Sequence, residues 1–239
     1  MPTIDETLKR LAISFTVRDI MVPVAGLVCA ANESEAAALS SDNPDFNVIP
    51  IRRNSGRFTS YFERDTRNAT KITLNNLISD GTSLLDLVQI LEDREFSFVL
   101  SQRIEGYVHF SDLNNHLVKY TFYVILEALE RHALNSLKRL DDRQYLMENL
   151  DEARFKQVVS RYKRAGDAAR SLFNYLNISD ILKLAVKAGT IQIDSGTIKA
   201  MKDTRNASAH PLEHLVSQYS DVKNLAMVRR ECLRILGGT

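Results

Sequence analysis

The first half of the chain alternates short apolar runs with segments of helical period. The runs are rich in β-branched and aromatic residues, as is typical of strands, and they lie at residues 27–29, 46–51, 58–62, 96–100 and 106–110. Residues 33–39 and 82–93 instead repeat their apolar positions every three or four residues, and Ser83 stands where it can cap the second helix. This order predicts an α+β region.

The same order of elements occurs twice in this region. Residues 46–49 and 96–99 have similar patterns and lie 50 residues apart, and a predicted helix precedes each of them. A turn, a second strand and an acidic residue follow in both cases. A repeat at this period predicts two copies of one supersecondary unit packed together.

Strand patterns disappear near Lys119, and long amphipathic helices replace them. We expect these helices at residues 120–140, 141–166, 168–188, 197–210 and 218–236. Pro211 disfavours helical geometry at His210, so the fourth helix should end or kink there. The fold class predicted is therefore an α+β domain over residues 1–118 followed by an all-α helical bundle over residues 119–239.

Composition and charge support two domains. The 239 residues, 44% of them hydrophobic, suffice for one large or two smaller globular domains. Residues 1–119 carry 12 basic against 16 acidic side chains, whereas residues 120–239 carry 19 against 14. This asymmetry indicates two units with different partners.

The N-terminus predicts an amphipathic helix over residues 3–15. Its apolar stripe consists of Ile4, Leu8, Leu11 and Phe15. The segment lacks the features of a signal peptide, and no apolar run approaches the roughly 18 residues of a membrane span. Cys29 and Cys232 lie far apart and resemble small buried hydrophobes of a reducing compartment. We expect a cytoplasmic protein that makes no membrane contact.

The densest basic stretch of the second half lies between residues 154 and 170. It consists of Arg154, Lys156, Arg161, Lys163, Arg164 and Arg170. Such a stretch can follow a phosphate backbone, or it can be an ordinary solvated helix face. The sequence leaves both interpretations open.

Two motifs of the first half resemble those of CBS domains. Residues 16–23, TVRDIMVP, match the opening of a first CBS motif, and residues 106–113, GYVHFSDL, match the closing element. The resemblance covers about residues 15–118. It implies a tandem CBS module that binds an adenine nucleotide (ATP, ADP or AMP) as a regulatory ligand.

The closing element of the family implies where that nucleotide binds. Its Thr and Asp usually hold the ribose; Asp112 keeps the acid here, whereas His109 replaces the Thr. The resemblance places the base beside Phe98, with Thr82 as a further nucleotide-binding residue. Asp112 has an alternative role as the N-cap of a helix over residues 113–120, because Asp caps helices well.

The first copy departs further from the family pattern. Its acid, Asp65, comes one residue early, and Glu63 replaces the Thr. The site with Asp112 is therefore the better candidate.

Residues 205–210, RNASAH, combine groups suited to phosphodiester chemistry. His210 suits proton transfer near neutral pH, and Arg205 is a permanent cation whose planar fork matches phosphate oxygens. On a helix Asn206 and His210 share a face, so Asn206 can orient its neighbours.

This segment resembles the Arg-x4-to-6-His motif of the HEPN superfamily, in the form with Asn after Arg. The resemblance covers about residues 120–239 and implies an all-helical, metal-independent endoribonuclease. It implies a homodimer in which the two motifs face each other. His210 would transfer a proton or position the 2′-hydroxyl, Arg205 would stabilise the phosphate charge, and Asn206 would orient them. We expect no metal site and no cofactor requirement for catalysis.

Together these features predict a homodimeric, toxin- or defence-like ribonuclease that cleaves RNA by 2′-hydroxyl transesterification. An adenine nucleotide on the CBS-like module would regulate it, and an antitoxin protein is a further candidate partner. Two alternatives stay open: a non-catalytic nucleotide- or RNA-binding sensor, and a CBS-based dimerisation or interaction protein.

Overall fold

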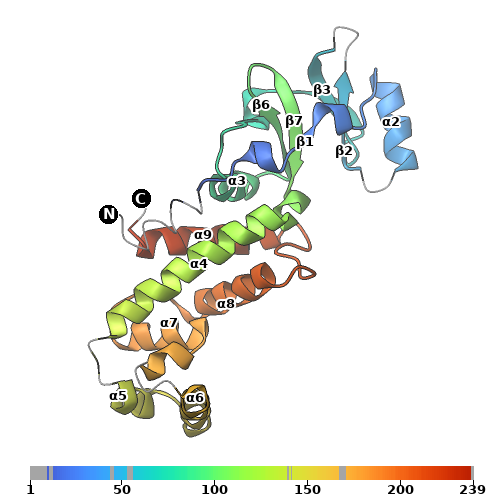
Figure 1. The fold of residues 1–239 in the computed structure, drawn as a ribbon. Coiled ribbons are helices and arrows are strands. Elements are labelled where there is room, and N and C mark those ends of the chain that lie inside the picture. The colour runs from blue at the N-terminus through green and yellow to red at the C-terminus, as the bar shows by residue number, and fades with distance from the viewer. Residues whose placement is uncertain are drawn as a thin grey trace. The chain divides into compact units, whose positions relative to one another are not determined.

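The computed structural model describes residue 10 and residues 13–43, 46–52, 56–138, 140, 142–166 and 171–237. They form two compact units: one spans Phe15–Leu117, and the other begins at Val118 and also includes the described residues that precede Phe15 (Figure 1). The division between Leu117 and Val118 lies one residue before the boundary expected at 118/119, whereas residues 13 and 14, expected in the first domain, belong to the helical unit. Most of the helix expected over residues 3–15 lies outside the described residues, and residues 13–15, which are described, are not helical.

The first unit contains two β-sheets. The four-stranded sheet has the order β1-β7-β6-β5 and consists of β1 (Val22–Pro23), β7 (Ile104–His109), β6 (Phe96–Leu100) and β5 (Leu77–Ser79). The three-stranded sheet has the order β2-β3-β4 and consists of β2 (Val48–Arg52), β3 (Phe58–Glu63) and β4 (Asn68–Lys71). Neighbouring strands are antiparallel except for the parallel pair β5 and β6.

The apolar runs predicted β2, β3, β6 and β7, whereas β1, β4 and β5 were not expected. The missed strands have two to four residues, too few for a clear alternation, and all four residues of β4 are exposed. The run expected as a strand at residues 27–29 only precedes an isolated bridge at Ala30.

Short helices connect these strands. They are η1 (Val17–Asp19), η2 (Val24–Gly26), α2 (Glu33–Asp42), η3 (Leu74–Asn76), α3 (Leu84–Leu91) and η4 (Phe110–Asn114). Asn32 caps α2, and Ser83 caps α3 by accepting a hydrogen bond from the Asp86 N–H at 3.1 Å. The cap predicted at Ser83 is confirmed.

The two halves of this unit share one strand register. Pro50 lies opposite Tyr61 in the β2–β3 hairpin, and Phe98 lies opposite Tyr107 in the β6–β7 hairpin. Both hairpins have an irregularity just before the last pair of residues in register. A repeat is therefore confirmed, but Val48 corresponds to Phe96, a spacing of 48 residues, so the predicted match of residues 46–49 with 96–99 is wrong by two residues.

The two copies also exchange strands. β1 precedes the first helix but pairs with β7 of the second copy, and β4 precedes the second helix but pairs with β3 of the first copy. The parallel pairing is repeated as well, since Ala30 pairs with Ile51 as Ile78 pairs with Val99. Neither copy can complete its sheet alone, so the pair folds as one module.

An aromatic cluster connects the two sheets. Tyr61 of β3 lies 5.1 Å from Phe96 and 5.7 Å from Phe98 of β6, measured between ring centroids. All three side chains are buried. Burial of such large rings stabilises the contact between the copies.

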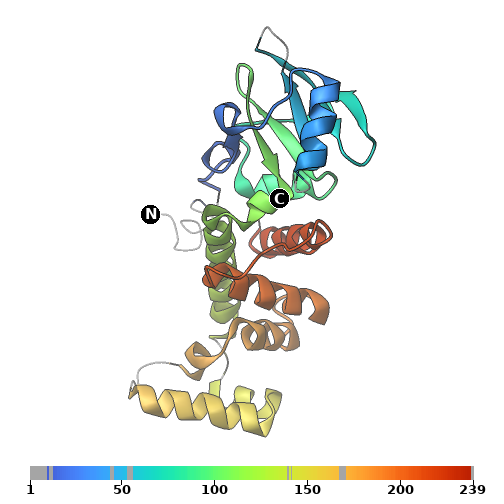
Figure 2. The same ribbon diagram turned by 90° about the vertical axis from the view of Figure 1, so that its right-hand side faces the viewer.

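The second unit is helical. Its elements are α4 (His116–Leu137), α5 (Asp142–Asn149), α6 (Glu152–Ala165), η5 (Leu172–Tyr175), α7 (Ile178–Lys187), α8 (Ser195–Ala209) and α9 (Asp221–Ile235). Helices α7, α8 and α9 stack in that order, and α4 crosses them on one side (Figures 1 and 2). Within the described residues, no helix combines the length and apolarity needed to cross a membrane.

Two helices expected from periodicity are interrupted. The one expected over 141–166 divides into α5 and α6, because Asp151 takes an extended conformation and its carboxylate accepts a hydrogen bond from the Arg154 N–H at 2.8 Å. The one expected over 168–188 begins only at Ile178, after the cap residue Asn177. Local capping thus overrides a continuous apolar period.

Candidate functional site

Asp112 lies in the turn that follows β7. It is the third residue of η4, and its Oδ2 accepts a hydrogen bond from the His109 N–H at 2.8 Å. His109 is the N-cap of the same turn, and its Nδ1 lies 2.9 Å from the Ser111 Oγ. The two residues that the resemblance assigns to the ribose are therefore adjacent, and each also has a structural role.

The capping role of Asp112 differs from the alternative expected for it. Asp112 does not cap a helix over residues 113–120 but stabilises η4 from within the turn. At the start of α4 the side chain of Asn115 accepts a hydrogen bond from the Leu117 N–H at 2.9 Å. Asn115 thus provides the polar cap expected of Asp112, because a separate 3-10 turn precedes the helix.

Burial sets the electrostatics of this turn. It raises the pKa of the Asp112 carboxyl, an effect opposed by the hydrogen bond from the His109 backbone. Burial likewise lowers the pKa of the His109 imidazole. A carboxylate that has lost hydration gains from a ligand that donates hydrogen bonds, as the two hydroxyls of a ribose do.

Phe98 is fully buried in the aromatic cluster. Its ring centroid lies 5.7 Å from that of Tyr61, 5.8 Å from that of Phe96 and 5.7 Å from that of Tyr107. A nucleotide base could reach Phe98 only by displacing these neighbours, so the base contact stays a prediction. Tyr107 stacks on His109 and so connects the cluster to the Asp112 turn.

Thr82 lies just before α3, where the opening segment of the first copy docks. Its carbonyl accepts a hydrogen bond from the Val17 N–H at 2.8 Å, and the Arg18 guanidinium pairs with the Asp80 carboxylate. In the described part of the chain, no hydrogen bond or ring contact joins Thr82 to the Asp112 turn. Its role in nucleotide binding also stays a prediction.

The opening and closing motifs meet at one strand pair, where Pro23 of β1 lies opposite Gly106 of β7. A Cβ at Gly106 would lie 2.7 Å from both the Val22 carbonyl oxygen and the Met21 Sδ. Glycine at the start of the closing motif is therefore required by the exchanged strand β1.

The first copy ends differently from the second. In the shared register Glu63 takes the place of His109, because each is the last residue of its strand and pairs with the start of the neighbouring strand. After Glu63 the chain turns back directly into β4, with Arg67 at φ 53° in the left-handed region. Asp65 lies in this tight turn and does not reproduce the position of Asp112.

The Arg205–His210 segment forms the C-terminal end of α8. The helix ends at Ala209, and His210 is extended, with φ −110° and ψ 119°. Pro211 explains this, since a residue before proline avoids helical geometry. The helix end predicted at His210 is confirmed, and the side chains of Asn206 and His210 are exposed.

Lys119 holds the backbone that follows this helix. Its side chain is buried, with 7% exposed, and its Nζ donates to the carbonyls of His210 at 3.3 Å and Pro211 at 2.9 Å. A third, short hydrogen bond goes to the carbonyl of Glu213. The ammonium thus uses its three donors on one loop, and this fixes the backbone of His210 without engaging the imidazole.

Arg205 is fixed on the α4 side of α8. Its guanidinium carbon lies 5.5 Å from the centroid of the Tyr123 ring, which is a cation–π contact. Burial raises the pKa of Glu130, and the charge of Arg205 acts in the opposite direction. Arg205 is therefore positioned by α4 while it remains partly exposed.

A hollow of about 520 Å³ lies between α8 and α9 beside the motif. Its lining includes Asp203 and Ala207 of α8 and His214 of the following loop. Among the described residues, no group of three or more His, Cys, Asp or Glu side chains is arranged to hold a metal ion.

Sequence reasoning identified the motif but missed the residues that position it, which are Lys119, Tyr123 and Glu130 on α4. The only local signal was a lysine within an otherwise apolar stretch of that helix. The carbonyls that Lys119 binds lie 91 to 94 residues further along the chain. No local pattern can reveal partners at that separation.

No protein-family model and no curated protein matches this sequence. Among solved structures, the chain is similar to the CBS domain of the bacterial CNNM/CorC family Mg²⁺ transporter in complex with ATP. The identity is 16% and the TM-score 0.37, over 48% of this chain and 94% of that chain. It is also similar to an uncharacterized conserved protein from Pyrococcus horikoshii, with 14% identity and a TM-score of 0.35, over 42% of this chain and 90% of that chain.

The structure is thus similar to CBS domains over about half of the chain. Identities this low, with TM-scores of 0.35 and 0.37, assign neither a ligand nor an activity to it.

Proposed function

We propose that the first unit binds an adenine nucleotide and that the second unit, as a homodimer, cleaves RNA under its control. The observation that supports nucleotide binding is the two-copy module itself. Its copies share one register and exchange strands, and of the two acids compared, Asp112 at the end of the second copy is half-buried whereas Asp65 of the first is exposed. The ribose hydroxyls would donate to the Asp112 carboxylate, beside His109.

A thermal-shift comparison tests the nucleotide part on the full chain. Adenine nucleotides at 100 times their dissociation constant should raise the free energy of unfolding by about 2.7 kcal/mol. Guanine nucleotides are the control for base selectivity. No response to any nucleotide at millimolar concentration would contradict the proposal and favour the CBS-based interaction protein.

The observation that supports RNA cleavage is the contrast at the end of α8. The His210 backbone is held by Lys119, its imidazole is exposed, and Arg205 is positioned over Tyr123 one turn earlier. Catalysis requires that the reacting groups are held in the correct geometry, and a backbone held by hydrogen bonds contributes to this.

The reaction would be internal transesterification. The 2′-oxygen attacks the adjacent phosphorus, a base removes the 2′-hydroxyl proton, and the bond from phosphorus to the 5′-oxygen breaks as that oxygen gains a proton. A cation such as Arg205 stabilises the charge on the phosphorane. The products carry a 2′,3′-cyclic phosphate and a 5′-hydroxyl.

One motif provides one imidazole, whereas the reaction uses a base and an acid. Two chains with facing motifs would provide both. Leu212, two residues after His210, is a large apolar side chain that is 92% exposed, which supports a contact between chains near the motif.

Cleavage of single-stranded RNA by the full chain, with chelator present, tests the catalytic part. We expect cyclic-phosphate products, and light scattering should show a dimer at micromolar concentration. A monomer would contradict the ribonuclease proposal. So would a protein that binds RNA but does not cut it, whether or not nucleotide is present, and either result would favour the non-catalytic sensor.

A further inference from the structure

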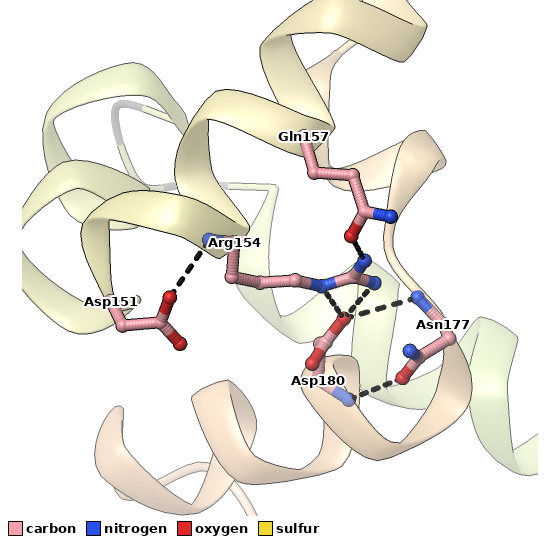
Figure 3. Close-up of polar contacts among 5 residues, drawn as sticks. All are labelled: Asp151, Arg154, Gln157, Asn177 and Asp180. Carbon is pink, nitrogen blue, oxygen red and sulfur yellow. Dashed lines mark hydrogen bonds and ion pairs between the residues drawn. The ribbon is translucent and has the colours of Figure 1, made fainter.

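The basic residues between 154 and 170 do not act together: Arg154 belongs to one set, Lys156, Lys163 and Arg164 to a second, and Arg161 to neither, whereas Arg170 lies outside the described residues. Arg154 belongs to the first set, because its guanidinium forms an ion pair with Asp180 of α7 and a hydrogen bond with Gln157 (Figure 3). The Arg154 and Asp180 side chains are only 16% and 15% exposed. Arg154 therefore joins α6 to α7, and its charge is not available to a ligand.

The second set faces a hollow of about 540 Å³ between α5 and α6. The hollow is lined by Arg143, Phe155, Lys156, Val159, Ser160, Lys163 and Arg164. Four of these residues are cations and none is acidic. Arg143 lies on α5, outside the basic stretch seen in the sequence.

Little in this hollow neutralises the cations. Lys156 forms an ion pair with Glu152, but both side chains are more than 70% exposed, so the pair is weak. Arg164 donates to the Ser160 Oγ at 3.2 Å, which leaves its charge unpaired. Within the described ranges, Arg143 and Lys163 form no ion pair.

The lining also contains an apolar surface among the cations. Phe155 and Val159 are four residues apart on α6, so they lie on one face, and both are half-buried. A ring beside unpaired cations suits single-stranded nucleic acid, because bases stack on aromatic rings while phosphates pair with cations. A duplex keeps its bases stacked within the helix, and an acidic peptide has no base to place on the ring.

We propose that the α5–α6 hollow is a binding site for single-stranded RNA. Arg143, Lys163 and Arg164 hold the phosphates, and Phe155 stacks on a base. The choice of RNA rests on the proposed function, but binding here does not require cleavage at His210.

Fluorescence anisotropy with a labelled, unstructured oligoribonucleotide tests this site. The protein is the full chain carrying His210→Ala, in chelator, so that the RNA stays intact. Adding Arg143→Gln, Lys163→Gln and Arg164→Gln together should weaken binding by about tenfold or more. It should also reduce the slope of log affinity against log salt concentration by about 2, since each phosphate contact on a single strand contributes roughly 0.7.

Arg161→Gln is the control matched to Arg164→Gln alone, because each removes one positive charge from α6 and Arg164, unlike Arg161, lines the hollow. Phe155→Leu tests stacking: it should weaken binding of the RNA by about fivefold or more and leave an abasic strand unaffected. Thermal unfolding of each variant verifies that the fold is intact.

Equal affinity of the triple variant and the Arg161→Gln control would overturn the proposal. So would a poly-glutamate peptide that binds as tightly as RNA and depends on the same residues, because the hollow would then be a dock for acidic protein. If the wild-type protein binds RNA through the hollow but does not cut it, only the catalytic proposal is refuted. If the triple substitution changes neither the rate of RNA cleavage nor the affinity for RNA, only the proposal of an RNA site in the hollow is refuted.

Discussion

Asp112 and His210 each lie just after the end of a strand or helix. The side chain of Asp112 stabilises the local structure, whereas the side chain of His210 does not. Asp112 follows β7, and its carboxylate stabilises the next turn. His210 follows α8 and contributes backbone atoms: its N–H donates to the Asn206 carbonyl and its carbonyl accepts from Lys119, while its imidazole stays exposed. The Asp112 carboxylate would serve both the fold and a ligand. At His210, by contrast, backbone atoms hold the fold, and the proposed reaction uses the imidazole instead.

This contrast has a measurable consequence. Substitution of Asp112 should change ligand binding and stability together, because one carboxylate serves both. Substitution of His210 should change activity alone. The variants below separate the two sites on this basis.

The largest effect is expected at His210. His210→Ala should lower the rate of RNA cleavage by about 100- to 10,000-fold, because it removes a proton-transfer group. The free energy of unfolding should change by less than about 0.5 kcal/mol, since the side chain is exposed. Cleavage kinetics and chemical denaturation measure the two quantities.

His214→Ala is the control for that experiment, since it removes another exposed imidazole from the same loop. It should retain cleavage. Equal losses in both variants would show that the motif has no special role.

Lys119→Met tests whether the fold holds His210 through its backbone alone. The variant keeps the apolar stem but removes the donor to three carbonyls, so we expect a loss of about 1–3 kcal/mol in the free energy of unfolding. Cleavage should fall as well, although Lys119 does not touch the RNA. Lys138→Met, at an exposed position after α4, should do neither.

A fully active Lys119→Met protein would show that the loop needs no anchor. A drop in kcat with unchanged KM would instead identify Lys119 as a positioning residue, because the substrate would still bind while the imidazole is misplaced.

Two substitutions of Asp112 separate its structural role from its role toward a ligand. Asp112→Asn keeps an acceptor for the His109 N–H but loses the charge, so the turn should persist while nucleotide affinity falls by about fivefold or more. Asp112→Ala removes both and should also cost about 0.5–2 kcal/mol of stability. Calorimetric titration and thermal unfolding measure these effects.

Asp65→Asn is the control in the other copy, where the acid lies in a tight turn. It should leave nucleotide affinity unchanged. A loss equal to that of Asp112→Asn would mean that both copies bind ligand, and the asymmetry between them would have no functional meaning.

The smallest effect is a pH dependence of stability. Burial raises the pKa of Asp112 above its ordinary value of 3.8. A raised pKa in the folded state contributes stability that is fully present below 3.8 and is lost as the pH rises through the higher value. Unfolding free energies of the wild type, measured from acid to neutral pH, should therefore decline relative to those of Asp112→Asn over this window. A constant difference between the two proteins would contradict it.

Parts of both units could be predicted from the sequence because their signals are local. The run at residues 96–100 coincides with β6, Ser83 caps α3, and Pro211 ends α8. The repeat was visible because the apolar runs of both copies form strands, but its predicted spacing of 50 residues exceeds by two the 48 that the strand registers give, since the apolar pattern does not set the register. β4 could not be predicted, since its residues are exposed and only pairing with β3 makes it a strand.

The sequence by itself determined the periods, the caps and the positions of Asp112, Arg205 and His210, because these depend on residues within a turn or two of each other. Tertiary structure alone decided which copy receives each exchanged strand and that Lys119 anchors a loop more than 90 residues away. It also turned Arg154 toward Asp180 and brought Arg143 to the hollow of α6. The physical reason is that a charged side chain takes its direction and its role from the partners that folding brings to it.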